Sequence, residues 1–307
     1  MLRGVLIIFL FLIMVRPVSA EQAGEDLSPV LKLDKLIEVA LKENHDILMA
    51  GSGIEILKYR IPQAGAPPDP MVMVGYENEG WSGYTYGEMP GARWVFSVSQ
   101  MIPWPGKLKT KELSLKKERE SLISNYEKTR LIIIEELKSK YHELLFAYKS
   151  LDATEEKIRL LERMEEIALS RYSAGMATLS EVTMAQAEKY MALEQRVMYR
   201  QKIKALEAMI NSIAGRDPLS PLGRPEEVST EKRELDDKDL IERAMDSPEI
   251  EEIKRLIESR QYKVKEAGLE YYPDLTLSAQ VSLKPEPYED MWMLSLSFNI
   301  PLFYSCL

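Results

Sequence analysis

The feature that most constrains this chain is a helical pattern that runs from Lys107 to Tyr172 without a single Pro or Gly. At about 1.5 Å per residue, a continuous helix of this length extends for on the order of 100 Å, far beyond the roughly three or four turns usual in globular proteins. Apolar residues recur within it at alternating spacings of three and four, which is typical of a coiled-coil seam. They are Ile134, Leu137, Tyr141, Leu144, Tyr148 and Leu151. The pattern predicts a rod.

The stretch RYSAGMATLSEV, residues 171–182, interrupts this pattern and predicts the turn of a helical hairpin. Gly175 can end the outgoing helix, and Thr178 or Ser180 can cap the next one. The return helix is expected to end at about Ala214, because the helix-breaking sequence GRDPLSP follows. It is therefore only about half as long as the outgoing helix. A further helix predicted over 33–61 has nearly the missing length, so two shorter helices placed end to end can line the long one.

An internal repeat divides the chain into two copies of one unit. The openings LIEVALKENHDI (36–47) and LIERAMDSPEI (240–250) share Leu-Ile-Glu, a following Ala and a closing Ile. Both copies then run in step to a proline, which opens two short alternating stretches that end at Ile-Pro. These landmarks are Pro70, Pro273, Ile102-Pro103 and Ile300-Pro301. The repeated unit is helix, strand, strand, and a long helical hairpin follows the first copy.

The predicted strands alternate apolar and polar residues. In 274–283 the odd-numbered positions from Leu275 to Leu283 are apolar, and the positions between them are Thr, Ser and Gln. Trp94, Phe96 and Val98 alternate with small or charged residues in the same way. Runs of about ten such residues suit a transmembrane barrel with lipid outside and water inside, and they fit a half-buried sheet of a soluble domain equally well. Four strands cannot close a barrel, so a barrel would have to be shared among several chains.

Composition indicates an exported protein. Residues 1–20 combine an early Arg3, an apolar run and a small-residue end, which is typical of a secretory signal peptide cleaved before Glu21. No later stretch approaches the roughly 18 apolar residues of a transmembrane helix. The single cysteine, Cys306, excludes an internal disulfide framework. The net charge of −9 argues against nucleic-acid binding, which usually requires a basic face.

Motifs that carry catalysis are incomplete. His142-Glu143 lacks the second histidine of a zinc-protease helix, and GSGIEI at 51–56 lacks the third glycine of a dinucleotide fingerprint. His45 is expected to be a surface or packing residue. Four methionines on predicted strands are expected to fill gaps or line a lumen and not to bind copper; they are Met71, Met73, Met291 and Met293. We therefore predict no enzyme, no cofactor and no metal site.

These landmarks resemble the TolC-type outer-membrane efflux proteins. The resemblance lies in the order helix, two strands, long hairpin, in the two repeat openings, in SQMIPWPGK (99–107) and in RYSAGMATLSEVTMAQA (171–187). It implies a mainly α-helical homotrimer in which each chain gives four transmembrane strands to one twelve-stranded outer-membrane β-barrel, continued by a helical tunnel in the periplasm. It further implies a periplasmic adaptor and an inner-membrane pump as partners, and lipid around the barrel. The form IPWPGK is similar to branches that serve resistance-nodulation-division pumps for heavy-metal cations.

Two sets of residues are singled out by the resemblance. The hairpin tip is expected to dock the adaptor; its residues are Arg171, Tyr172, Gly175, Thr178, Leu179, Glu181 and Val182. The strand-to-helix turn consists of Pro103, Pro105, Gly106 and Lys107. The expected division is a signal peptide at 1–20, first-repeat helix 21–69, first strand pair 70–102, long hairpin 103–215, linker or equatorial segment 216–238, second-repeat helix 239–272, second strand pair 273–301 and a truncated end 302–307.

Family members carry a second hairpin after the second strand pair, and this sequence departs from that pattern at Tyr304-Ser305-Cys306-Leu307. By repeat symmetry, roughly 110 residues would be missing. A frameshift or premature stop is therefore one expectation, and the chain would then be a non-functional fragment of a duct. The other alternative is a soluble periplasmic coiled-coil scaffold or adaptor whose strands form an ordinary sheet.

Overall fold

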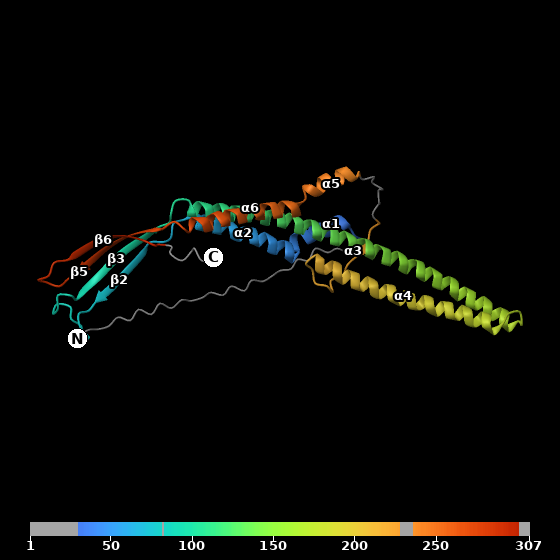
Figure 1. Ribbon diagram of the computed structural model, residues 1–307. Coiled ribbons are helices and arrows are strands. Elements are labelled where there is room, and N and C mark those ends of the chain that lie inside the picture. Colours follow the sequence, from blue (N-terminus) through green and yellow to red (C-terminus); the bar gives the residue numbers. More distant parts are fainter. Residues whose placement is uncertain (1–29, 82, 228–235, 301–307) are drawn as a thin grey trace.

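The computed structural model describes residues 30–81, 83–227 and 236–300. The molecule is a long rod with a β-sheet at one end and a helical hairpin tip at the other (Figure 1). Its helices are α1 Leu33–Glu43, α2 His45–Gly65, α3 Lys107–Ser173, α4 Leu179–Ile213, α5 Asp237–Met245 and α6 Pro248–Leu269. Its strands are β1 Val30–Leu31, β2 Met71–Glu77, β3 Arg93–Ile102, β4 Arg224–Pro225, β5 Leu275–Leu283 and β6 Met291–Phe298.

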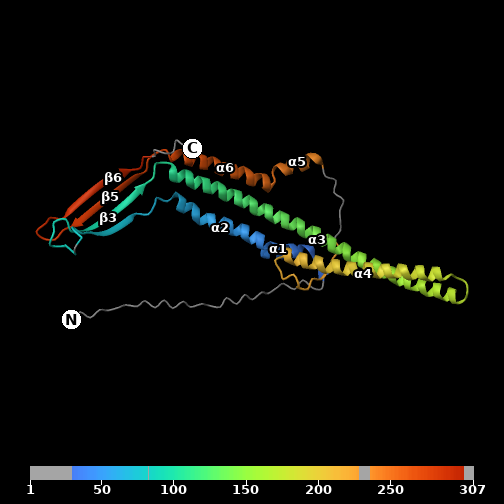
Figure 2. The ribbon, with the colours of Figure 1, turned by 60° about the horizontal axis from the view of Figure 1, so that its bottom comes forward.

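Helix α3 is the predicted long helix, and its 67 residues form the spine of the rod. Helices α2, α1 and α4 follow one another along it, as predicted for shorter helices placed end to end (Figure 2). At the centre of the predicted seam, Leu137, Tyr141 and Leu144 are fully buried. Ile134 is only half-buried, and its neighbour Ile133 takes the core position. The apolar core therefore lies where α1 and α4 meet α3.

The prediction of one continuous helix at the start of each repeat is wrong, because each is two helices. In the first repeat the break is at Asn44, whose side-chain oxygen accepts hydrogen bonds from the backbone N–H groups of Asp46 and Ile47. In the second repeat Ser247 caps α6 in the same way, and Pro248 occupies the first helical turn. The side chains of Asn44 and Ser247 each accept from backbone N–H groups that the first turn of a helix leaves unpaired, so each favours the start of a new helix at that point. Pro248 has no N–H group and suits the first turn of a helix.

The core is closed by a short parallel sheet that sequence reasoning missed. Strand β1 pairs with β4, which lies in the segment expected to be a linker. The hydroxyl of Tyr141 lies 2.9 Å from the Leu31 carbonyl oxygen and 2.8 Å from that of Glu226, so it bridges the ends of both strands. Two-residue strands carry too little pattern to be read from a sequence, and this pairing depends on α3 passing beside both.

The larger sheet has the strand order β2-β3-β5-β6, and every neighbouring pair is antiparallel. The predicted pairs β2–β3 and β5–β6 are confirmed, and the β3–β5 ladder joins the two repeats edge to edge. Trp94, Phe96 and Val98 share one face, as predicted. Val95 is an apolar residue on the opposite, mostly polar face, where it is almost fully buried.

Several expectations concern residues outside the described ranges. These are the signal peptide at 1–20, residues 301–307 with Pro301 and the departure at 304–307, and residues 228–235 of the linker.

Candidate functional site

The hairpin tip is built by matched helix ends. Gly175 has φ of 73°, a left-handed conformation that glycine adopts without a side-chain penalty. The N–H groups of Gly175 and Met176 donate to the carbonyls of Tyr172 and Arg171, which closes the end of α3. Thr178 then starts α4 with a reciprocal capping box, in which its hydroxyl and the Glu181 carboxylate each bond the other's backbone N–H. The turn is therefore well defined by the predicted residues.

Immediately behind the turn, α3 and α4 form an apolar groove of about 400 Å³. Its apolar walls are Leu161, Met164, Ile167, Ala168, Met184 and Ala185. Arg171, Glu181 and Glu188 lie along its rim. Sequence reasoning selected the turn and missed this groove, because its lining comes from two helices that run in opposite directions.

Side chains around the tip differ in how far they face solvent. Leu179 and Met176 are exposed, whereas Val182 is 4% exposed and packs inside the hairpin. Val182 therefore supports the hairpin and does not offer its side chain to a partner. Behind the groove, an ion pair joins Lys189 of α4 to Glu165 of α3. The hydrogen bond from Lys189 lowers the pKa of the Glu165 carboxyl.

At the other end of α3, the predicted strand-to-helix turn forms a joint between the two repeats. The Lys107 side chain is only 7% exposed, and its ammonium lies 2.9 Å from a carboxylate oxygen of Asp274 and 3.3 Å from one of Glu270. It also donates to the carbonyl of Tyr272 at 3.0 Å. Burial lowers the pKa of Lys107, but its hydrogen bonds to Asp274 and Glu270 outweigh that effect and raise the pKa above its usual value.

Trp104 completes this joint. Its backbone N–H donates to Asp274 at 2.8 Å, and its ring stacks on Tyr272 with centroids 5.2 Å apart. Gly106 allows the chain to turn here, since its φ is 98°. The joint holds the start of α3 against the end of α6. Pro103 and Pro105 lie between β3 and α3 and contribute no N–H group to this network.

The sheet extends beyond the helices and has one apolar face, with no described helix lying across it (Figures 1 and 2). The register places fourteen exposed apolar side chains on that face: Val72, Val74, Trp94, Phe96, Val98, Ile102, Leu275, Leu277, Val281, Leu283, Trp292, Leu294, Leu296 and Phe298. The opposite face carries serines, Gln280 and the four methionines. Strands β2 and β6 lie at its two edges.

The residues considered for catalysis or metal binding are not brought together. His142 lies on α3 and His45 at the start of α2, and both are exposed. The GSGIEI segment lies inside α2 and not at a strand-to-helix turn. Within the described ranges, no group of His, Cys, Asp and Glu side chains could hold a metal ion. Among the same residues, no helix combines the length and apolar character needed to cross a membrane.

A family model identifies the family of the chain, and solved structures share its fold. The family model described as outer membrane efflux protein matches residues 36–216. No curated protein sequence matches the chain. Among solved structures, the outer membrane protein VceC of Vibrio cholerae matches with a TM-score of 0.69 at 18% identity, over 88% of this chain and 68% of that one.

Two outer membrane channels are also similar to the chain in structure, again at low sequence identity. CmeC of Campylobacter jejuni has a TM-score of 0.72 at 17% identity, over 88% of this chain and 61% of CmeC. MtrE of Neisseria gonorrhoeae, solved in its open state, has a TM-score of 0.64 at 15% identity, over 88% of this chain and 63% of MtrE. At these identities the likeness establishes a shared fold, and the chain spans less than two thirds of both channels.

Proposed function

The chain belongs to the outer membrane efflux protein family, and from this premise we propose that it forms the outer-membrane exit duct of an efflux system. Three copies would each give β2, β3, β5 and β6 to one twelve-stranded barrel. The helices would form a tunnel in the periplasm, and a periplasmic adaptor would join the duct to an inner-membrane pump. Small molecules or metal cations would leave the cell through it.

The observation that carries this proposal is the uncovered apolar face of the sheet. A soluble antiparallel sheet covers its apolar face with other elements, whereas Trp292 is 80% exposed and Val72 is 72% exposed here. Apolar patches of this extent mark contact with protein or lipid. The alternation along the strands suits lipid on this face and water on the other.

The open edges of the sheet support sharing among copies. Strands β2 and β6 each have one neighbour, so each presents unpaired N–H and C=O groups on its outer side. Such groups cannot remain unpaired in a bilayer, and only a closed ring of strands satisfies all of them. Pairing β6 of one copy with β2 of the next closes the ring, and three copies give the expected twelve strands.

We assign adaptor docking to the hairpin tip and the groove behind it. Exposed Leu179 and Met184 lie beside an apolar cavity with charged residues at its rim, which suits an amphipathic helix of a partner. For the pump, the proposed resistance-nodulation-division type for heavy-metal cations is supported only by the IPWPGK turn.

Fractionation of cells that express the chain tests the membrane assignment. A duct is expected in the outer membrane, extracted only by detergent, and migrating as a heat-resistant trimer during electrophoresis. The second candidate function, a soluble periplasmic scaffold, predicts recovery in the soluble periplasmic fraction. It is favoured only by the length of the helical rod, which scaffolds share.

Site-directed crosslinking tests the tip. In a Cys306→Ser background, Leu179→Cys places a thiol at the tip, and Val264→Cys places one on α6 with comparable exposure. We expect adaptor crosslinks at Leu179→Cys and none at the control. The tip assignment also requires that Gly175→Trp weakens crosslinking and export, because the turn needs a left-handed backbone conformation at this position, which glycine adopts most easily. Equal crosslinking at both thiols would refute it.

A further inference from the structure

Helix α6 contacts α3 through a seam with coiled-coil spacing but polar residues. On α3 the facing residues recur three or four apart; they are Ser114, Lys117, Ser121, Asn125 and Lys128. On α6 they include Glu252, Arg255, Ser259 and Tyr262. These positions normally carry Leu, Ile or Val, and polar residues there lower the stability of the pairing.

Ion pairs and side-chain hydrogen bonds hold this polar seam together. Between the helices, Lys128 pairs with Glu252 at 2.7 Å, Lys117 with Glu258 at 2.9 Å, Lys263 with Glu118 at 2.9 Å and Arg255 with Glu120 at 3.3 Å. Ser114 and Ser259 also meet across the seam, with their hydroxyl oxygens 3.4 Å apart. The hydrogen bond from Lys117 lowers the pKa of Glu258.

Apolar burial contributes little to this contact. Among the described residues, Ser259 is the only buried residue of α6, and neither apolar cluster of the rod contains a residue of this helix. By contrast, the α3–α4 contact is closed by Ile158, Leu161 and Ala192. Helix α6 therefore packs on α3 mainly through ion pairs and polar side chains, whereas α1 and α4 pack on α3 mainly through apolar side chains.

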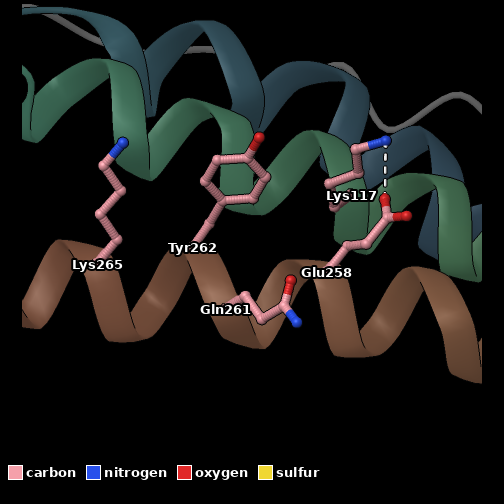
Figure 3. A pocket seen from close by; sticks show the side chains of 5 residues that line it. All are labelled: Lys117, Glu258, Gln261, Tyr262 and Lys265. Atoms are coloured by element: carbon pink, nitrogen blue, oxygen red, sulfur yellow. Dashed lines mark ion pairs between the residues drawn. The ribbon is translucent and has the colours of Figure 1, made fainter.

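Solvent reaches the middle of the seam. A hollow of about 380 Å³ opens beside the Lys117–Glu258 pair (Figure 3), and Tyr262 and Lys265 of α6 extend along it toward α3. Ion pairs in contact with water are weakened by dissolved salt, because mobile ions screen the electrostatic interaction. The screening (Debye) length is about 10 Å at 0.1 M salt and shortens as the salt concentration rises. The strength of the seam should therefore depend on ionic strength.

One end of α6 is fixed by different means. The joint of Lys107, Trp104, Tyr272 and Asp274 holds its C-terminal end, and the β3–β5 ladder continues directly beyond it. Lys107 is nearly enclosed there, so salt screens this joint less than the half-buried ion pairs of the seam.

We propose that the α3–α6 seam is a salt-sensitive interface that opens about the Lys107 joint. At high ionic strength α6 separates from α3 along the polar seam, while the sheet and the apolar part of the rod stay packed. The inference concerns the two repeats within one chain and does not depend on the proposed export function.

Hydrogen exchange of the full chain in detergent, followed by mass spectrometry at roughly 50 mM and 500 mM NaCl, tests the proposal. The four ion pairs between the helices are half-buried, and at the usual strength of an ion pair in contact with solvent their combined loss corresponds to about a tenfold change in opening. We expect backbone amides of 250–266 to exchange about tenfold faster at high salt. Amides of β5 and of α4 should exchange at unchanged rates.

Charge-removing variants separate the seam from general salt effects. Glu118→Gln, Glu252→Gln and Glu258→Gln together should give fast exchange in α6 already at low salt. The matched control is Glu55→Gln, Glu127→Gln and Asp239→Asn, which removes three exposed pairs within single helices and should leave α6 unchanged.

A variant of the joint tests the pivot. Lys107→Met should extend the salt-dependent exchange into β5, because the fixed end of α6 is released. The proposal is overturned if exchange in α6 does not respond to salt in the parent chain. It is equally overturned if α4 and α6 respond alike, or if the seam variant and its control behave identically.

Discussion

Replacing Gly215 by alanine tests the packing at the end of α4 against a control in the same backbone conformation. Gly215 and Gly175 both have φ of 73°, and both end a helix. A Cβ at Gly215 would lie 2.6 Å from the carbonyl carbon of Glu43 and 3.2 Å from the nitrogen of Asn44, with the Glu43 oxygen closer still. A Cβ at Gly175 would meet nothing within 4 Å. The pair therefore separates conformational strain from steric overlap.

The expected costs follow from these geometries. A non-glycine residue in the left-handed region costs about 1–2 kcal/mol, so both variants lose this amount of unfolding free energy. Overlap with backbone cannot be relieved by a side-chain rotation, and forcing extra atoms into a packed site costs a further 1–3 kcal/mol or so. We expect Gly175→Ala to lower the free energy of unfolding by about 1–2 kcal/mol and Gly215→Ala by about 2–5 kcal/mol.

Urea unfolding of the two variants and the parent, followed by far-ultraviolet circular dichroism in the same detergent, measures the difference. The slopes against denaturant must agree for the free energies to be compared. Hydrogen exchange should also locate the Gly215→Ala effect at the α1–α2 break. If Gly215→Ala is no more destabilising than Gly175→Ala, the close approach of α4 to this break does not hold in solution.

Three further predictions concern burial, capping and ionisation. Leu137→Ala should lower the free energy of unfolding by about 2–5 kcal/mol, whereas Leu160→Ala, exposed on the same helix, should change it by less than about 0.5 kcal/mol; denaturant titration measures both. Thr178→Ala should cost about 1 kcal/mol through loss of the capping box, seen as faster amide exchange in the first turn of α4. Burial, followed by its hydrogen bond with Glu207, raises the pKa of Tyr148 to about 12, so its contribution to stability is complete below about pH 10 and is lost as pH rises toward 12. Ultraviolet titration measures the pKa of Tyr148, with the signal of Tyr148→Phe subtracted to remove the other tyrosines. The pKa of Tyr148 should be lower in Glu207→Gln than in the parent chain, and an unchanged pKa would contradict the Tyr148–Glu207 contact.

Much of the candidate site follows from short stretches of sequence. The tip turn was predicted from Gly175 and Thr178, because helix ends are set by residues within a few positions of the break. The groove behind the tip was not predicted, since Met164 and Met184 meet only when the hairpin closes. Val182 was assigned to the docking surface from the family resemblance, and a sequence motif does not tell which face of α4 the helix α3 covers.

The sequence by itself determined the length of α3, the alternation of the strands and the two-copy plan, because helix and strand periodicity are local properties of the chain. Only the tertiary structure decided that β3 pairs with β5, that Gly215 meets the α1–α2 break, and that polar seams on α3 and α6 face each other. Each of these contacts joins residues more than a hundred positions apart, and the complementarity of such partners appears only once the fold has brought them together.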